Sequence, residues 1–191
     1  MTPQAFVTKW KPVTTTERAS SQSHFIDLCA LLGQPAPLDA DPTGEWYAFE
    51  KGASKATGGQ GWADVWRREC FGWEYKGPGR DLAKAYQQLQ LYRESLENPP
   101  LLIVSDIQTI EVHTNFTNTV KQVHRFTLDD LLDPRQLDRL RVRHTTKRTA
   151  PVHARGQRDR FRRDGDDRFH LASSFRCHKY TNAVPAINPQ A

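Results

Sequence analysis

The stretch ADVWRRECFGWEYKG at residues 63–77 places three charged side chains, Asp64, Glu74 and Lys76, among aromatic residues. Mg²⁺ prefers hard oxygen ligands and keeps several of its waters, so two carboxylates with one backbone carbonyl form a sufficient site. We expect that carbonyl to come from Tyr75. The chemistry predicted for such a cluster is phosphodiester hydrolysis. Lys76 would orient the attacking water and offset charge in the transition state.

A predicted β-hairpin would bring the three side chains together. Residues 62–68 and 71–77 are two short runs that can pair as antiparallel strands around a tight turn. Residue numbers that sum to about 139 then face each other, which puts Asp64 opposite the stretch from Glu74 to Lys76. Side chains alternate along a strand, so Glu74 and Lys76 point to the same face. An ordinary salt bridge on a solvated strand face is the alternative interpretation.

The wider pattern predicts an α/β fold with a mixed central sheet and helices on both of its faces. The segment LLIVSDI, which starts at residue 101, is apolar on both sides, as a central strand must be when helices cover both faces. Glycine-rich residues 52–61 predict a mobile loop. The predicted helices cover 14–33 and 81–97, further strands cover 45–51, 109–114 and 120–126, and residues 127–140 form a short helix or a broken pair.

Charge and composition divide the chain into a domain of residues 1–140 and a tail of residues 141–191. The domain carries 15 basic and 18 acidic residues, a net charge of −3, whereas the tail carries 12 basic and 4 acidic residues, a net charge of +8. Five Leu, Ile and Val residues in the tail are too few to offset chain entropy, which predicts disorder. A basic nucleic-acid arm and an out-of-frame sequence are the two alternatives.

Composition also limits where the protein works. The longest apolar run is LLIV at 101–104, so we expect no membrane association. The N-terminal segment has no continuous apolar stretch of the kind found in secretory signals. Three widely spaced cysteines match neither a disulfide framework nor a zinc motif. A cytoplasmic location is therefore expected.

The element order and the trio together resemble the core of the PD-(D/E)XK nuclease superfamily. The order is a helix, a strand, a strand with Asp64, a strand with Glu74-x-Lys76, a helix and a strand. On the second helix, Gln88 and Tyr92 resemble the Gln-x-x-x-Tyr motif of RecB-like members. The alternative for this pair is that Tyr92 packs in the core and Gln88 is one of several glutamines on that helix.

Longer motifs narrow the resemblance to one family. The segments ERASSQSHFIDLCALLGQPAP, GGQGWADVWRRECFGWEYKG, YQQLQLYRESLENPPLLIVSD and EVHTNFTNTVKQVHRFTLDDLLDP occur in this order. They are similar to the N-terminal region of MmeI-like type IIL restriction–modification enzymes, over about residues 5–140. In that family a nuclease domain is fused to a helical spacer, an adenine methyltransferase and a target-recognition domain, and its nuclease motif falls on Asp64, Glu74 and Lys76.

The resemblance implies a Mg²⁺-dependent DNA endonuclease domain that binds double-stranded DNA. We expect weak DNA binding, because the domain is slightly acidic and the chain has no room for the target-recognition domain. The methyltransferase motif Asn-Pro-Pro-Tyr is absent and no S-adenosylmethionine site is expected. The chain therefore corresponds to an isolated, truncated nuclease domain. The alternative is a catalytically silent DNA-binding or remnant module that has kept the fold.

Three further residues are weaker candidates. Glu17 on the first helix is a possible additional metal-site carboxylate, as first-helix acids are in some nucleases of the superfamily, although its spacing from Thr14 also matches a capping box. Lys51 and Lys55 flank the glycine-rich loop and are candidates for contacts to DNA phosphates. Solvated lysines in a loop are the equal alternative.

Overall fold

The computed structural model describes residues 1–14, 16–54 and 59–141. Six strands in these ranges form one mixed sheet, in which the strands lie side by side in chain order. All neighbouring strands are antiparallel except β3 and β4, which are parallel. The strands are β1 (Tyr47–Ser54), β2 (Gln60–Arg67), β3 (Phe71–Tyr75), β4 (Leu101–Ser105), β5 (Thr109–Thr114) and β6 (Val123–Thr127).

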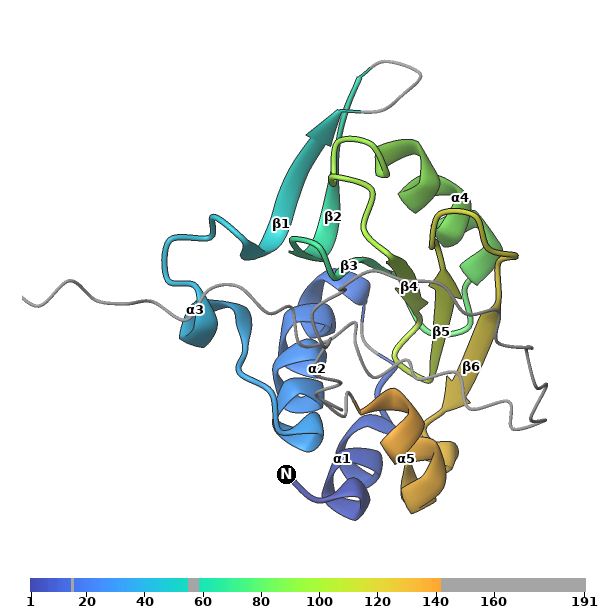
Figure 1. Ribbon diagram of the computed structural model, residues 1–191. Coiled ribbons are helices and arrows are strands. Elements are labelled where there is room, and N and C mark those ends of the chain that lie inside the picture. The colour runs from blue at the N-terminus through green and yellow to red at the C-terminus, as the bar shows by residue number, and fades with distance from the viewer. Residues whose placement is uncertain (15, 55–58, 142–191) are drawn as a thin grey trace, which may run out of the picture.

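Helices cover both faces of this sheet, and α4 lies on the opposite face from α1, α2 and α5 (Figure 1). The parallel β3–β4 pair explains the position of α4, because two parallel neighbours need a crossover connection and a helix usually supplies it. The helices are α1 (Pro3–Trp10), α2 (Glu17–Leu32), α3 (Pro37–Ala40), α4 (Leu82–Tyr92), the 3₁₀ helix η1 (Asp129–Leu132) and α5 (Pro134–Leu140).

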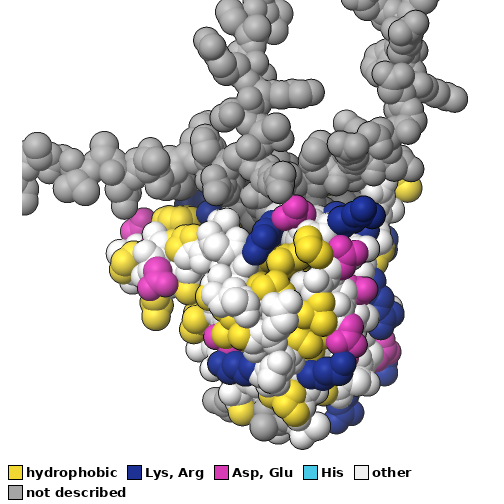
Figure 2. Space-filling view, turned by 90° about the horizontal axis from the view of Figure 1, so that it is seen from below, with side chains coloured by type: hydrophobic (Ala, Val, Ile, Leu, Met, Phe, Trp, Pro, Cys, Tyr) yellow, Lys and Arg dark blue, Asp and Glu magenta, His cyan; other side chains and the backbone are white. Residues whose placement is uncertain are grey.

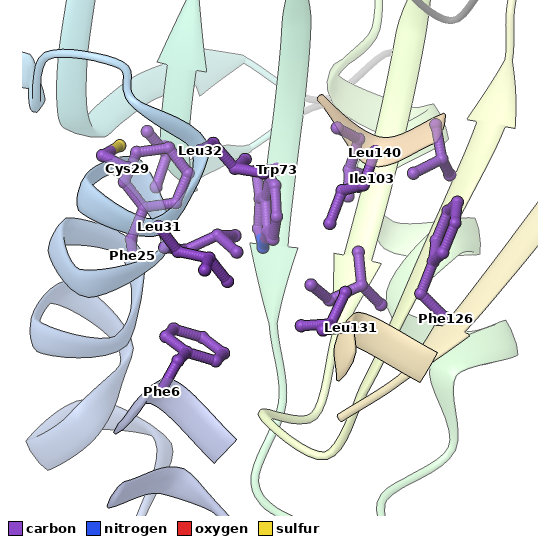
Figure 3. Packing of buried hydrophobic residues seen from close by; sticks show 14 of the residues in the cluster. Phe6, Phe25, Cys29, Leu31, Leu32, Trp73, Ile103, Phe126, Leu131 and Leu140 are labelled. Carbon is purple, nitrogen blue, oxygen red and sulfur yellow. The ribbon is translucent and has the colours of Figure 1, made fainter. Parts of the chain in front are cut away.

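Strand β3 alternates between the two faces of the sheet. Its odd-numbered side chains, Phe71, Trp73 and Tyr75, belong to the large core under α1 and α2. Figure 3 shows Trp73 between side chains of α2 and Ile103 of β4. Its even-numbered residues face α4, where Gly72 leaves space for two leucines. The charged residue Glu74 therefore lies on the α4 face.

The predicted fold class, a mixed α/β sheet with helices on both faces, is confirmed. The structure also confirms LLIV as a buried strand between two neighbours, and the broken pair in 127–140. Helix α2 begins later than predicted, with Thr16 as its N-cap, so the predicted capping box of Thr14 and Glu17 is wrong. Gly33, with a left-handed backbone at φ 68°, ends this helix.

Two further parts of the structure differ from what the sequence predicted. Helix α1 was not predicted, because the segment PQAFVTKW is too short to show a clear helical period. Residues 52–54 and 60–61, predicted as part of a loop, instead extend β1 and β2 into a long arm that projects from the body of the domain (Figure 1). Cross-strand pairing of Gly52 with Trp62 and of Ala53 with Gly61 overrides the weak strand propensity of the glycines.

The predicted disordered tail, residues 142–191, lies outside the described residues. Within the described ranges, we find no helix with both the length and the apolar character that a bilayer span requires. On the face shown in Figure 2, basic and acidic side chains are interspersed among hydrophobic ones. That mixture agrees with the nearly balanced charge of residues 1–140.

Candidate functional site

The β2–β3 hairpin has the predicted form, with a register one residue from the predicted one. Val65 lies opposite Trp73 and Trp66 lies opposite Gly72, so continuing the register places Asp64 opposite Glu74. The paired region ends at Val65, whereas β3 stays paired with β4 up to Tyr75. The two strands therefore separate at the level of the two carboxylates.

The side chain of Asp64 takes the place of a backbone partner where the strands separate. Its Oδ2 accepts a hydrogen bond from the backbone N–H of Tyr75 at 2.6 Å. A strand residue directs its N–H and its C=O toward the same neighbouring strand, so the Tyr75 carbonyl also faces β2. The Asp64 carboxylate thus lies at the backbone of the residue whose carbonyl the sequence suggested as a metal ligand.

Glu74 is the centre of a second set of contacts. Its Oε1 accepts hydrogen bonds from Lys76 Nζ at 2.8 Å and from Gln88 Nε2 at 2.5 Å. The Glu74 side chain is 4% exposed and that of Lys76 is 23% exposed, so the ion pair lies at the boundary between the core and solvent. Charge-assisted hydrogen bonds are about twice as strong as neutral ones, which fixes the orientation of this carboxylate.

Tyr92 completes the α4 side of the site. It lies one helical turn beyond Gln88, and it covers Gly61 of β2 so closely that a Cβ on that glycine would collide with the Tyr92 hydroxyl oxygen and two ring carbons. Burial raises the pKa of the Tyr92 hydroxyl, and the nearby Glu74 carboxylate raises it further. Gln88 and Tyr92, suggested by a motif, therefore both lie beside Glu74.

An irregular position in the β1–β2 pair accompanies Asp64. The two strands keep one register on either side of it, from Phe49 opposite Val65 to Lys51 opposite Ala63. Between these pairs, Glu50 has a left-handed backbone with φ 51°. Irregular strand positions are common beside functional sites, where they redirect a side chain. In this register Glu50 lies opposite Asp64, the residue whose side chain reaches across to Tyr75.

The residues present fit a Mg²⁺ ion of the expected kind. Among the described residues, no three His, Cys, Asp or Glu side chains gather in one group. A site that relies on water ligands needs fewer protein ligands, however, and two carboxylates with a carbonyl match this requirement. Asp64 and Glu74, on facing positions of separating strands, together with the carbonyl of Tyr75, the residue after Glu74, match that set.

The weaker candidates have different outcomes. Glu17 is the first residue of α2, and its side chain lies outside the described part of the structure. Lys51 packs over the ring of Trp66, with Nζ 4.4 Å from the ring centroid, which is a cation–π contact. Lys55 lies outside the described residues.

His24 has a positioning role that the sequence did not reveal. It is completely buried, with Nδ1 2.8 Å from the hydroxyl of Tyr75. Burial lowers its pKa to about 3, so the ring is neutral at physiological pH. The Tyr75 side chain is thus held on one face of the sheet, while Asp64 holds the backbone of the same residue.

A loop after β3 closes the site on the side of α4. The backbone N–H of Lys76 donates to Ser105 C=O at 2.7 Å, and that of Gly79 donates to Asp106 Oδ2 at 3.1 Å. Gly79 has φ 73°, a conformation that glycine adopts readily. The contact of Asp106 depends on β4 lying next to β3, so it could not be inferred from the sequence alone.

Comparisons with protein-family models, with curated proteins and with solved structures find no match to this chain.

Proposed function

We propose that the domain is a Mg²⁺-dependent DNA endonuclease of the PD-(D/E)XK type, similar to the nuclease domain of MmeI-like type IIL enzymes. One observation carries the proposal: Asp64 is bonded to the backbone of Tyr75, the residue between Glu74 and Lys76, and those two form an ion pair. The motif residues, which come from two consecutive strands, therefore meet at the end of one strand pair.

Each side chain has a distinct role in the proposed reaction. Asp64 and Glu74, with the Tyr75 carbonyl, hold the cation. A bound Mg²⁺ ion polarises the scissile phosphate and lowers the pKa of a coordinated water. Lys76 supplies a positive charge and hydrogen-bond donors beside the phosphate. Gln88 holds the Glu74 carboxylate in place, and the raised pKa of Tyr92 keeps its hydroxyl protonated.

The first test is the melting temperature with and without Mg²⁺. At Mg²⁺ about ten times its dissociation constant, wild-type protein is expected to melt roughly 3 °C or more higher than without metal. Asp64→Asn is expected to lose this rise, because it removes a ligand charge. Without metal it should melt at or above the wild-type temperature, because the amide oxygen still accepts the Tyr75 hydrogen bond and repulsion from Glu74 is removed.

Two further variants complete the test. Asp129→Asn changes a carboxylate on η1, paired with Lys11 away from the site, and is expected to keep the metal-dependent rise. Lys76→Met is expected to keep this rise as well but to lose cleavage of supercoiled plasmid DNA, since Lys76 acts on the phosphate rather than on the metal. Equal melting temperatures for wild type and Asp64→Asn under both conditions would contradict the metal site.

A catalytically silent module is the second candidate, and one contact favours it. Glu74 Oε1 already accepts hydrogen bonds from both Lys76 and Gln88, as it would in a purely structural ion pair. In that case Mg²⁺ has no effect on melting, and Glu74→Gln lowers the melting temperature equally with and without metal. The same set of measurements therefore separates the two candidates.

A further inference from the structure

A cavity of about 620 Å³ lies beside Lys76, on the side of the loop that follows β3. Three cationic side chains, Lys76, Arg80 and Lys84, line it together with the carboxylate of Asp81. The rest of the lining comes from Thr16, Gly77 and Gly79. The excess of positive charge contrasts with residues 1–140 as a whole, whose net charge is −3.

The acidic residue in the cavity wall is already engaged. Asp81 is the N-cap of α4, and its Oδ1 accepts hydrogen bonds from the N–H groups of Ala83 and Lys84 at 2.9 and 3.3 Å. Its Oδ2 lies 4.0 Å from Lys84 Nζ. Since these N–H groups are occupied, the attraction for an anion comes from the side chains of Arg80 and Lys84, both of which are exposed.

The cavity and the candidate site share one face of α4. Lys84, Gln88 and Tyr92 follow one another at intervals of four residues, so their side chains lie in one row along the helix. One interval corresponds to about 6 Å along the axis. Lys84 is therefore one turn from the glutamine that holds Glu74, and Lys76 borders both the cavity and this carboxylate.

The loop geometry keeps the cavity open. Asp106 anchors the Gly79 N–H, and the Arg80 N–H donates to Gly77 C=O at 3.1 Å, so Arg80 has a fixed starting point. Its side chain runs across Gly77, where a Cβ would lie 3.8 Å from Arg80 Cγ. A Cβ on Gly79 would meet no atom within 4 Å. The loop thus leaves space for a group the size of a phosphate.

We propose that this cavity binds a backbone phosphate of the DNA strand next to the scissile one, with Arg80 and Lys84 as its ligands. The assignment to DNA rests on the proposed function. Guanidinium and ammonium groups in a solvated cavity bind phosphate oxygens without regard to base sequence. The contact would align the strand along the row of α4 side chains and present the neighbouring phosphate to Lys76.

The test is the salt dependence of DNA binding by the full chain without metal. The cavity would hold one phosphate, and the loss of one phosphate contact lowers the slope of log K against log salt by about 0.9, so Arg80→Ala/Lys84→Ala is expected to lower it by about that amount and to weaken binding about tenfold at low salt. The basic tail contributes equally to every variant. A fluorescent duplex and anisotropy provide the readout, and melting temperatures verify folding.

The matched control removes the same charge elsewhere. Lys11→Ala/Arg135→Ala changes two exposed cations near η1 and α5 and is expected to leave the slope within experimental error of wild type. Equal slopes for all three proteins, or equal losses in both double variants, would overturn the proposal. A rise in melting temperature with inorganic phosphate that depends on Arg80 and Lys84, with an unchanged DNA slope, would assign the cavity to a small phosphate instead.

The salt dependence of DNA binding can be measured whether or not the protein cleaves DNA. If wild type neither cuts DNA nor responds to Mg²⁺, the proposed function fails, while a slope that depends on Arg80 and Lys84 still establishes the phosphate site. If cleavage is present, the double variant is expected to raise KM about tenfold and to keep kcat within about threefold, because uniform binding is lost rather than transition-state stabilisation. A loss confined to kcat would contradict a strand-positioning role.

Discussion

The two faces of the sheet are built from the same strands but differ in character. Toward α2, β3 presents Phe71, Trp73 and Tyr75, which join a large aromatic core. Toward α4, the same strand presents only Gly72 and Glu74 between these residues, over a smaller apolar cluster. The α2 face holds most of the buried hydrophobic residues, and this leaves the α4 face able to hold a charged group at its margin.

The difference shows how a small domain can accommodate a nearly buried carboxylate. Burying a charge is costly unless it is paired and hydrogen-bonded. Glu74 has both kinds of partner, Lys76 and Gln88, and the aromatic face on the other side supplies stability that does not depend on this pair. Changes on the α2 face should therefore act on folding, and changes on the α4 face on the site.

Trp73→Ala is expected to have the largest effect. The side chain is completely buried and contacts Phe25, Phe71 and Tyr75, so its removal should lower the free energy of unfolding by about 3–5 kcal/mol. Urea denaturation followed by circular dichroism measures the change. Trp62→Ala is the control, since that side chain is 59% exposed and its loss should cost well under 1 kcal/mol. Similar costs for both would contradict the role assigned to the α2 face.

Gly61→Ala is expected to have the next largest effect, on the α4 face. The added methyl group would collide with the Tyr92 ring, so the free energy of unfolding should fall by about 1–3 kcal/mol and the ring should move away from Glu74. Chemical denaturation gives the energy, and the fluorescence-detected titration of Tyr92 gives the displacement. At Gly52 the same substitution meets Trp62 only at 3.7 Å, so Gly52→Ala should behave like wild type. Equal effects at both glycines would refute the proposed collision.

The pH dependence of the free energy of unfolding tests the protonation state of His24, whose imidazole contacts the Tyr75 hydroxyl. The pKa of His24 falls from 6.5 to about 3 on folding, so between these values the unfolded chain binds a proton that the folded protein does not. Stability should therefore be complete above about pH 6.5 and decrease as the pH falls, by about 2 kcal/mol at pH 5.

His24→Gln is expected to remove that part of the acid sensitivity. His113, whose burial lowers its pKa to about 4, acts in the same direction, so the measured quantity is the difference between wild type and variant across pH 7 to 5. Urea denaturation at each pH gives the two profiles. Parallel profiles would show that His24 is not kept neutral by its burial.

The sequence predicted the relative positions of the candidate site residues better than it predicted the space around them. The register of a short hairpin follows from its turn, so Asp64, Glu74 and Lys76 could be placed to within one residue. Gln88 followed from a motif on a clearly periodic helix. Arg80, Lys84 and Asp106 could not be found in this way, because the cavity exists only where the loop after β3 meets the end of β4.

Errors in the secondary structure also had physical causes. Glycine-rich residues of the β1–β2 arm have weak intrinsic strand propensity, and pairing with the opposite strand decides their conformation. One of these glycines, Gly61, is needed because Tyr92 occupies the space of a side chain. Helix α1 has only eight residues, too few for a long amphipathic pattern. Burial of Phe6, Val7 and Trp10 stabilises it instead.

The alternation along β3 also makes folding of the domain sensitive to the register of this strand. A slip of one residue moves every side chain to the opposite face, so an insertion or deletion before Glu74 would drive its carboxylate into the aromatic core and turn Trp73 toward α4. A chain with this shifted register would lose the packing of the aromatic core as well as the site. The position of the motif residues and the folding of the domain therefore depend on the same strand register.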